Sequence, residues 1–414
     1  MEQPPKGALS HLRVLDLSRV LAGPWCTQIL ADLGADVIKV ERPGEGDDTR
    51  HWGPPFLKDA QGQDTQEASY FSCTNRNKRS ITLDLAHPKG QTLVRQMAQH
   101  SDVLVENFKV GGLKGYGLDY ESLHALNPQL IYCSITGFGQ TGPSAQRAGY
   151  DLMIQAMSGM MSITGRGDEV AGGGPQRVGV AVTDILTGVY ASTAILAAIE
   201  ARHHTGLGQH IDMALLDVGM AMLANQASGF LNTGKVPQRQ GNSHPSLAPY
   251  QDFPTADASM LLAIGNDGQF ARFSEAAGHP QWSQDPRFAS NTLRVQHREA
   301  LVQTLQKVTR TRSTATWIAL LEDRAVPCGA INDLAQAFAE EQVQARGLVQ
   351  RQTRSADEQA LTPIATVASP LRLSATPTRL RHAPPALGQH TDEILAELGF
   401  DAQQMAALRR QKVV

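Results

Sequence analysis

The feature that most limits the possible folds is an alternation of short apolar runs and amphipathic segments that starts near Leu12. The runs RVLDLS, ADVIKVE, SITLDL, DVLVENF and LIYCSITGFG are rich in strand-forming residues, and most are followed by a turn and a segment with helical spacing. This order is typical of βα units that build a parallel sheet. Pro24 suits a first helical residue, and Gly34 suits the position just after that helix. We therefore predict an α/β first half.

The pattern changes after about residue 230, which predicts a second, smaller domain. Residues 234–248 are rich in Gly, Gln, Asn, Ser, His and Pro and indicate a connector. A hairpin in YQDFPTADASMLLAIGN and helices at 269–277, 298–309 and 317–322 favour an α+β unit. Short strands from about Leu361, the linker RHAPPALGQH and a helix from about Thr391 complete the chain. The predicted boundaries are 1–230, 231–345 and 346–414.

Composition excludes several functional classes. The 414 residues carry a formal charge of -3, and Lys and Arg are spread along the chain, so we expect neither a nucleic-acid nor a membrane partner. The cysteines lie far apart without metal-like spacing, which predicts free thiols and no metal site. They are Cys26, Cys73, Cys133 and Cys328. The N-terminal residues lack an apolar signal region, and we expect a cytoplasmic protein.

The stretch PQRVGVAVTDILTG places one carboxylate, Asp184, at a predicted strand-to-helix junction. Val178, Val180 and Val182 alternate with small residues, as in a strand, and residues 185–200 have helical spacing. An aspartate there can simply cap the helix. Alternatively, ligands bind beyond the carboxyl ends of parallel strands, so Asp184 can serve a reaction. Local sequence leaves both interpretations open.

Other candidate chemistries are weaker. The first turn has Gly23 followed by Pro24 in place of GxGxxG, which argues against a dinucleotide site even though Glu41 ends the second strand. No GxSxG elbow is present. Arg42 suits either a ribose phosphate or a solvated surface position. The pair Tyr150 and Asp151 is a candidate for acid/base chemistry but also fits a structural role.

The chain resembles the class III CoA-transferase family, also called CaiB/BaiF-like, along nearly its whole length. The blocks that carry the resemblance are VLDLSRVLAGPWCTQILADLGADVIKVERPGEGDDTR, NRNKRSITLDL, VENF, SITGFGQTGP, RAGYD, VGVAVTDILTG and GQHTDEILAELG. They occur in the family's order and spacing. The connector GNSHPSLAPYQ replaces the glycine run of the formyl-CoA branch and is similar to the succinyl-CoA:dicarboxylate branch, in which glutarate is an acceptor. The resemblance therefore implies succinyl-CoA as donor and a short dicarboxylate as acceptor.

The resemblance also implies a role for individual residues. Asp184 matches the family's nucleophile, which forms an aspartyl anhydride and then an aspartyl-CoA thioester. Tyr150 and Asp151 match a Tyr-acid pair beside it, and His244 and Arg19 are candidate partners for a substrate carboxylate. Lys114 replaces a family arginine, because Gly115 stands at that position. The remaining positions implied to line the CoA site are Leu21, Ala22, Arg42, Leu83, Asn107 and Phe108.

The fold implied by the family is a large doubly wound, Rossmann-like domain, completed by residues 346–414, with a smaller α+β domain inserted. Two such chains would thread through each other as an interlocked homodimer. The resemblance implies no permanently bound cofactor, with coenzyme A entering as part of the substrate. The alternative activity is that of an α-methylacyl-CoA racemase, but racemases place a His where this chain has Tyr150, and a neutral phenol is a poor base. A non-catalytic CoA-binding protein is a third possibility, which the presence of Asp184 disfavours.

Overall fold

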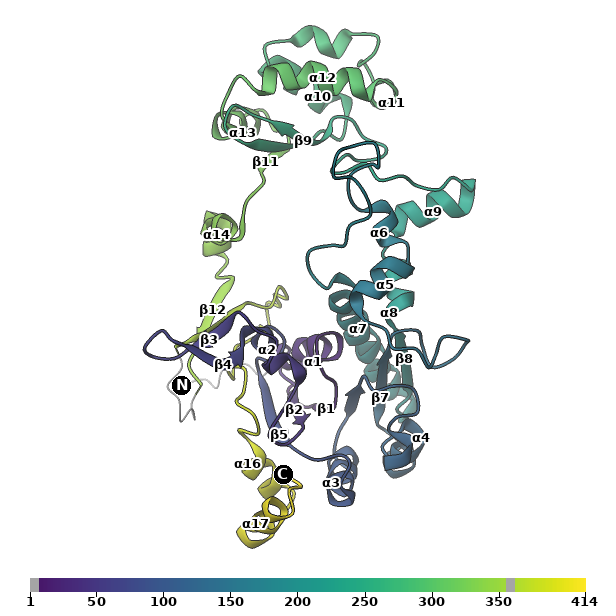
Figure 1. The fold of residues 1–414 in the computed structure, drawn as a ribbon, viewed down its shortest axis with the longest axis vertical. Helices are drawn as coiled ribbons and strands as arrows, with labels where there is room; N and C mark the ends of the chain where they lie inside the picture. Colours follow the sequence, from purple (N-terminus) through teal and green to yellow (C-terminus); the bar gives the residue numbers. More distant parts are fainter. Residues whose placement is uncertain (1–6, 355–361) are drawn as a thin grey trace. The chain divides into compact units, whose positions relative to one another are not determined.

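The computed structural model describes residues 7–354 and 362–414, and the chain divides into two compact units (Figure 1). Unit 1 contains the chain up to Ser158, Gly179–Ala224 and Gln344–Val414. Unit 2 contains Gly159–Val178 and Asn225–Val343. The predicted boundary at residue 230 puts residues 159–178 in the large domain, but they cluster with unit 2. Arg239 of unit 2 donates hydrogen bonds to the carbonyl oxygens of Ser162 and Arg166, which fixes the segment there.

A six-stranded parallel sheet forms the centre of unit 1, which confirms the α/β prediction. Its strand order, 3-2-1-4-5-6 by position in the chain, is that of a doubly wound dinucleotide-binding sheet. From edge to edge the strands are β5 (Lys78–Thr82), β2 (Asp36–Glu41), β1 (Arg13–Asp16), β6 (Val103–Glu106), β7 (Ile131–Thr136) and β8 (His210–Ala214). Every neighbouring pair is parallel.

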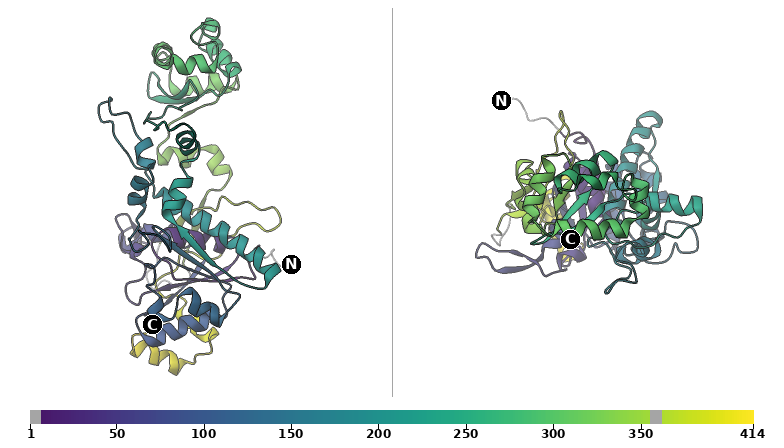
Figure 2. Two further views of the ribbon diagram at one scale, coloured as in Figure 1. Left: turned by 90° about the vertical axis from the view of Figure 1, so that its right-hand side faces the viewer. Right: turned by 90° about the horizontal axis from the view of Figure 1, so that it is seen from above.

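Helices cover both faces of this sheet because successive strand residues point to opposite sides. Val14 contributes to one hydrophobic core and Leu15 to the other. The first core packs α1 (Ala22–Asp32), α5 (Asp151–Met157), α7 (Val182–Thr205) and α8 (Leu215–Ala221) on the sheet. The second packs α3 (Pro88–Gln99), α4 (Tyr120–Leu126), α16 (Thr391–Glu397) and α17 (Ala402–Arg410). Figure 2 shows these helices as layers on the two sides of the strands.

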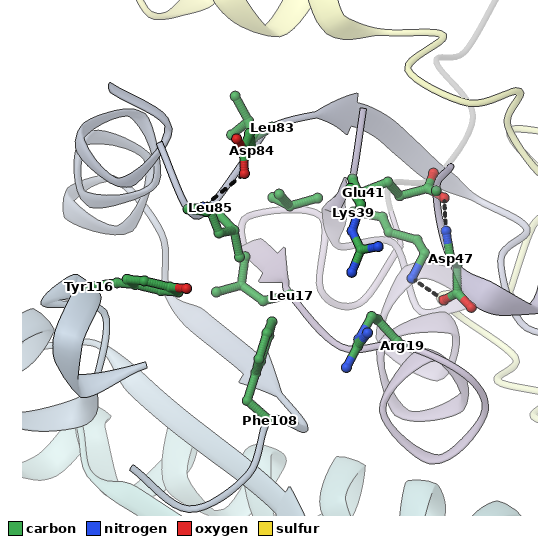
Figure 3. Close-up of a pocket in the computed structure, with 14 residues that line it drawn as sticks. Leu17, Arg19, Lys39, Glu41, Asp47, Leu83, Asp84, Leu85, Phe108 and Tyr116 are labelled. Carbon is green, nitrogen blue, oxygen red and sulfur yellow. Dashed lines mark hydrogen bonds and ion pairs between the residues drawn. The ribbon is translucent and has the colours of Figure 1, made fainter. Parts of the chain in front are cut away.

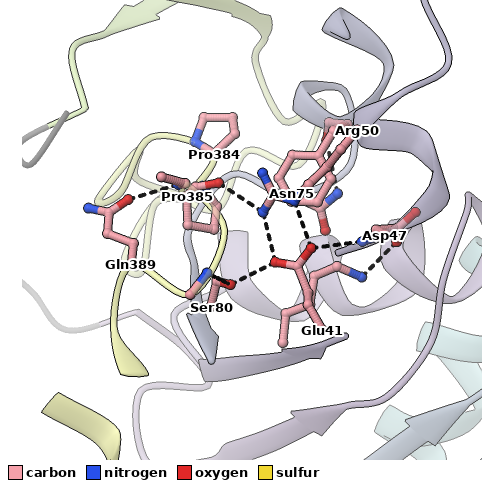
Figure 4. A network of polar contacts seen from close by, with 12 residues as sticks. Glu41, Asp47, Arg50, Asn75, Ser80, Pro384, Pro385 and Gln389 are labelled. Carbon is pink, nitrogen blue, oxygen red and sulfur yellow. Dashed lines mark hydrogen bonds and ion pairs between the residues drawn. The ribbon is translucent and has the colours of Figure 1, made fainter. Parts of the chain in front are cut away.

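The C-terminal segment of unit 1 attaches beside edge strand β5. His390 donates its backbone N–H to the Ser80 carbonyl, and Asp84 donates to Val413. A buried polar network adds side-chain contacts, because the Arg50 guanidinium joins Glu41 to the carbonyl of Pro385 (Figure 4). Smaller elements of unit 1 are η1 (Asp48–Arg50), β3 (Phe56–Lys58), β4 (Asp64–Ala68), α2 (Ser69–Ser72), η2 (Lys114–Tyr116), β12 (Val349–Gln352) and β13 (Ile364–Val367).

Unit 2 is an α+β unit with its own hydrophobic core. The predicted hairpin is confirmed as the antiparallel pair β9 and β10, to which β11 adds. Its elements are α6 (Met160–Ile163), α9 (Ala224–Thr233), β9 (Tyr250–Pro254), β10 (Ser259–Ala263), α10 (Asp267–Ala276), η3 (Pro280–Gln284), α11 (Asn291–Gln296), α12 (Arg298–Thr309), α13 (Thr314–Glu322), β11 (Cys328–Ala330) and α14 (Leu334–Ala339). Helix α15 (Glu341–Ala345) spans the boundary with unit 1, and Ala224, the first residue of α9, belongs to unit 1.

Three local predictions were wrong. Residues 178–182 form no strand; α7 begins at Val182, so Asp184 lies in its first turn. Residues 178–182 pair with no strand. Gly179 interrupts the run, and Val180 is 55% exposed instead of buried against a neighbour. Pro24 is the third residue of α1 and not its first. The sequence after the HIDMALL strand predicts one helix to about Phe230, but the structure has two helices there, α8 and α9.

Candidate active site

The candidate site lies at the topological switch point of the sheet, where β1 and β6 are neighbours but their chains continue to opposite sides. In such sheets a crevice opens beyond the carboxyl ends of these two strands. The turn Ser18–Leu21 follows β1, and residues 107–110 follow β6. Two cavities open there, of about 220 Å³ and about 190 Å³. We call them the Asp184 cavity and the Arg42 cavity after a residue that lines each.

The Asp184 cavity joins segments from the N-terminal half of unit 1 to the start of α7. It has basic side chains as well as the carboxylates of Asp48 and Asp184. Its lining residues are Arg19, Val20, Leu21, Ala22, Asp48, Asn107, Phe108, Lys109, Val110, Ile135, Thr136, Gly137, Ala145, Gln146, Arg147, Ala148, Gly149, Tyr150, Asp184 and Leu215.

Asp151 holds the first turn of α7 in place and so positions Asp184. Its Oδ1 accepts the backbone N–H groups of Thr183 at 2.9 Å and of Asp184 at 3.4 Å, and it also accepts the Thr183 hydroxyl. Gln155 donates to Oδ2 at 2.6 Å. The Asp151 carboxylate therefore caps α7 from a neighbouring helix and leaves the Asp184 carboxylate free to face the cavity.

The position of Asp184 makes its carboxylate difficult to ionise. Burial, followed by the negative charge of Asp151, raises the pKa of Asp184 to about 7. A helix N-terminus favours a carboxylate and acts in the opposite direction, so desolvation and like-charge repulsion outweigh it. A poorly hydrated carboxylate near neutral pH is suited to nucleophilic attack, because little water must be removed before it reacts.

Three motif glycines let the segments of the site approach closely. A Cβ on Gly188 would lie 2.7 Å from the Ala22 carbonyl oxygen, so α7 packs directly on the start of α1. A Cβ on Gly137 would lie 2.5 Å from the Gly149 Cα. The loops SITGFG and RAGYD therefore meet backbone to backbone, which brings Tyr150 and Asp151 beside α7.

The Arg42 cavity combines apolar walls with cationic side chains (Figure 3). Leu17, Leu83, Phe108 and Tyr116 supply apolar surface. Arg42 is 62% exposed at its side chain and pairs with Glu45 at 2.5 Å, so its guanidinium is accessible at the rim. Such a combination suits a flat ring system carrying phosphate groups.

The two cavities share a wall formed by Arg19 and Phe108. The Arg19 guanidinium lies 5.3 Å from the centroid of the Phe108 ring, a cation–π distance, and 3.6 Å from an Asp48 oxygen. Asn107 binds the backbone of Arg19 on both sides, accepting its N–H at 2.9 Å and donating to its carbonyl at 2.7 Å. An elongated ligand can thus contact both cavities across one fixed wall.

The structure brings most of the predicted site residues together. Seven line the Asp184 cavity, two further residues line the Arg42 cavity, and Asp151 supports Asp184 from behind. The first group is Arg19, Leu21, Ala22, Asn107, Phe108, Tyr150 and Asp184, and the second is Arg42 and Leu83. Lys114 is exposed in η2 and lines neither cavity, although its neighbour Tyr116 does. His244 belongs to unit 2, where its ring lies 5.2 Å from that of Tyr250, and its role stays a prediction.

Two side chains that line the Asp184 cavity, and a third whose pKa responds to Asp184, were not predicted from the sequence. Lys109 and Arg147 line the Asp184 cavity, and in the sequence they look like solvated loop residues. Tyr70 is half-buried, and its pKa is raised to about 12 by burial and then by the charges of Cys73, Asp184 and Asp151. Its phenol is therefore neutral and within electrostatic reach of Asp184. No local sequence signal distinguishes it from other aromatic residues.

Metal-ligand clusters and membrane-spanning helices are two further features that bear on function. Among residues 7–354 and 362–414, no group of three or more His, Cys, Asp or Glu side chains could hold a metal ion. Over the same residues, α7 alone has the length and hydropathy of a membrane span. Its residues Ala191, Ile195 and Ala198 pack in the first core of unit 1, as expected of a core helix.

Comparison with known proteins gives consistent matches along the chain. The model of CoA-transferase family III matches residues 9–391. The chain is 51% identical over 393 residues to the succinate–glutarate CoA-transferase of Agrobacterium fabrum, covering 95% of this chain and 96% of that one. It is 41% identical over 407 residues to the succinyl-CoA:glutarate CoA-transferase of Homo sapiens, covering 98% and 90%. A solved CAIB/BAIF family protein from Brucella suis superposes with a TM-score of 0.84 at 48% identity, covering 95% of this chain and 100% of the other.

Proposed function

The chain belongs to CoA-transferase family III, and we propose that it moves CoA from succinyl-CoA to glutarate or a similar short dicarboxylate through covalent intermediates on Asp184. The enzyme class itself follows from the family. The observation that supports this reaction best is the cavity that Asp184 lines at the switch point, beside a second cavity that suits a phosphorylated ring system. An acyl-CoA has its reactive thioester at one end and its nucleotide at the other, and the two cavities match these ends.

The reaction begins with attack of the Asp184 carboxylate on the thioester carbonyl of succinyl-CoA. The C–S bond breaks, CoA leaves as the thiolate, and a mixed anhydride joins Asp184 to succinate. The thiolate then attacks the aspartyl carbonyl, which releases succinate and leaves an aspartyl-CoA thioester. The acceptor carboxylate attacks this thioester, and the freed thiolate attacks the acceptor carbonyl, giving the new acyl-CoA and the original carboxylate.

The protein's contribution is to hold the reacting groups and to keep water away. A CoA bound at its nucleotide end keeps the departing thiolate next to the anhydride, and effective concentrations of well-oriented groups reach roughly 10⁵ M or more. The apolar and glycine residues around Asp184 limit hydrolysis of the anhydride. Asp151 keeps the nucleophile in place throughout, since its hydrogen bonds go to the backbone of α7 and not to the reacting carboxylate side chain.

The basic residues of the Asp184 cavity support a dicarboxylate acceptor. Arg19, Lys109 and Arg147 all line it, and a second carboxylate on the acceptor would find a cation there. Arg147 and Lys109 have no ion pair with an acidic side chain among the residues that the structure describes. A monocarboxylate of the same length would leave this charge unmatched. The same feature disfavours purely apolar acyl groups as preferred substrates.

Several further properties are part of the proposal. The enzyme needs no permanently bound cofactor, because every bond change involves only Asp184, CoA and the two acids. A cytoplasmic location is supported by the four free thiols. An interlocked homodimer, with residues 346–414 completing the large domain of each chain, is the expected assembly. Exposed apolar side chains on adjoining helices support an interface; they are Leu152, Met157, Val189, Tyr190, Leu196 and Met220.

An acceptor screen tests the proposed activity directly. The purified enzyme is incubated with succinyl-CoA and a panel of C2 to C6 mono- and dicarboxylic acids, and acyl-CoA products are identified by mass spectrometry. We expect glutaryl-CoA as a major product and little product from oxalate. A parallel incubation in D₂O without an acceptor separates transferase from racemase, since racemisation exchanges the proton at carbon 2 and anhydride chemistry does not. Rapid carbon-2 labelling without transfer would contradict the proposal.

A further inference from the structure

Val20 adopts a backbone conformation that valine normally avoids. Its φ is 71°, in the left-handed region, and it lies in the turn between β1 and α1. A β-branched residue in this region is a genuine outlier, and such strain persists only where the surrounding structure enforces it. Gly23, three residues later, is not the residue that takes the positive φ here. The chain thus uses a strained valine where glycine would be free of strain.

A buried ion pair enforces the turn from one side. The Lys39 ammonium and the Asp47 carboxylate are 2.9 Å apart, and both side chains are 0% exposed (Figure 3). Asp47 accepts the Val20 N–H at 3.2 Å, and Lys39 donates to the Ser18 carbonyl at 2.9 Å. Each member of the ion pair therefore also binds the backbone of the turn, Lys39 at Ser18 and Asp47 at Val20.

The rest of the turn is held just as firmly. Ser18 donates its N–H to Asp16 at 3.0 Å, while Asn107 binds both backbone groups of Arg19. Asp47 is itself fixed from behind, because its N–H donates to Glu41 at 3.0 Å, and Glu41 pairs with Arg50 (Figure 4). Side chains from β1, from β2 and from the loops after β2 and β6 thus bind the backbone of three residues, Ser18, Arg19 and Val20. An ordinary surface turn requires far fewer side-chain hydrogen bonds to its backbone.

The turn lies where its shape matters for the proposed reaction. Arg19, Val20, Leu21 and Ala22 all line the Asp184 cavity. Ala22 begins α1 and touches α7 at Gly188, one helical turn after Asp184. A relaxation of Val20 to negative φ would swing the backbone that forms this wall. Displacements of about 1 Å at a reacting centre can lower a rate about 10²-fold.

We propose that Asp47, held by Lys39, is a positioning residue that keeps Val20 in its left-handed conformation and thereby presets the part of the Asp184 cavity wall that residues 19–22 form. This inference rests on the proposed transferase function. Asp47 also lines the Arg42 cavity, but both of its carboxylate oxygens are occupied by Val20, Thr49 and Lys39, so we assign it no hydrogen bond to substrate. Its effect passes through the backbone of Val20.

A mutant cycle between Asp47 and Val20 tests the inference. Asp47→Asn should lower kcat for succinyl-CoA and glutarate about 100-fold, with KM changed less than about threefold, because the wall is displaced but binding groups remain. Val20→Gly supplies the second background of the cycle, since glycine adopts positive φ without strain, and its own kcat is the reference there. The double variant should recover at least tenfold of the kcat lost in Asp47→Asn. A merely structural Asp47 predicts no such recovery.

Asp32→Asn is the matched control. Asp32 is also a buried aspartate in an ion pair, 2.5 Å from Arg76, but it makes no contact with residues 18–20. Its loss should change thermal stability, and Val20→Gly should bring no recovery of kcat in that background. If Asp47→Asn does not fold, as judged by circular dichroism, the same cycle is run with Asn107→Ala, which releases Arg19 from the other side.

The outcomes separate this inference from the proposed function. A double variant no faster than the single Asp47 or Asn107 variant would overturn the positioning role while leaving the transferase mechanism intact. Retention of transfer in Asp184→Ala would overturn the mechanism whatever the cycle shows. Recovery in the Asp32 background equal to that in the Asp47 background would also contradict the proposal, because the effect would then be unspecific.

Discussion

At the scale of single residues, the site depends on two aspartates with different tasks. The Asp151 carboxylate accepts the backbone N–H groups of Thr183 and Asp184, so it caps the N-terminus of α7. Asp184 lies next to Thr183 in the first turn of α7, and its carboxylate lines the Asp184 cavity. Burial and the charge of Asp151 raise the pKa of Asp184 to about 7. Two similar side chains thus differ in function because one is hydrogen-bonded to the helix and the other is only desolvated.

The pH dependence of the rate follows from the raised pKa of Asp184. Attack requires the ionised carboxylate, so kcat/KM should rise with pH up to about 7 and then level off. Asp151→Asn removes the repelling charge but keeps an oxygen that can accept the Thr183 N–H. Its profile should therefore reach the plateau at lower pH. A wild-type midpoint near 4, or no acid shift in the variant, would contradict this reading of the site.

The same group makes folding stability depend on pH, with the opposite sign. A raised pKa means that the folded chain holds the Asp184 proton more tightly than the unfolded chain. The resulting stabilisation is complete below the usual aspartate pKa and is lost as pH rises to about 7. Asp184→Asn avoids this loss, so its stability advantage over wild type in urea unfolding should grow by about 2.5 kcal/mol between pH 5 and pH 8. An advantage independent of pH would show that Asp184 ionises normally.

At the scale of elements, the packing of α7 on α1 places the nucleophile. Gly188 allows this contact, since a Cβ there would lie 2.7 Å from the Ala22 carbonyl oxygen and 3.0 Å from Trp25. The sequence indicated a strand leading to Asp184, but the segment before α7 has no partner strand. The alternation of valines therefore predicted a strand wrongly. The strands predicted at β1, β2, β6 and β7 are confirmed, because each of these segments pairs with neighbours inside the sheet.

Gly188→Ala should separate α7 from α1. Alanine favours helix by about 1 kcal/mol over glycine, but overpacking costs about 1 to 3 kcal/mol, so we expect a net loss of stability and a lower kcat. Gly229→Ala in α9 is the control, because no atom lies within 4 Å of the added Cβ there. It should be neutral or stabilising in urea unfolding, with unchanged kcat. Equal effects of the two substitutions would mean that the α1–α7 contact is not close.

At the scale of the whole molecule, the C-terminal segment and the N-terminal half build one unit. Backbone pairs such as His390 with Ser80 join residues more than 300 positions apart. Contacts between such distant segments leave no pattern in the local sequence, so only the family resemblance suggested that the C-terminal segment completes the large domain. The same holds for the site: Asp184, Arg42 and Asn107 could be named from motifs, but the roles of Val20 and Asp47 could not. Their contacts depend on the folded turn, and each looks like an ordinary loop residue in the sequence.

The exposed apolar side chains of α5, α7 and α8 predict a dimer in solution. Sedimentation analysis should give a mass of twice 44.6 kDa. Leu196→Glu, on the exposed side of α7, should weaken the assembly or prevent soluble expression, because it buries an unpaired charge in the interface. Glu322→Ala in α13 of unit 2 changes a single charge elsewhere and serves as the control. A monodisperse monomer of the wild-type chain at micromolar concentration would contradict the proposed assembly.

The most direct test of the account is detection of the covalent intermediate on Asp184. Wild-type enzyme is incubated with succinyl-CoA without acceptor, quenched with hydroxylamine, digested and examined by peptide mass spectrometry. We expect a hydroxamate on the peptide containing Asp184, its absence when succinyl-CoA is omitted, and loss of both adduct and CoA transfer in a folded Asp184→Ala variant. Transfer by that variant within tenfold of wild type, or an adduct on a different residue, would contradict the central claim.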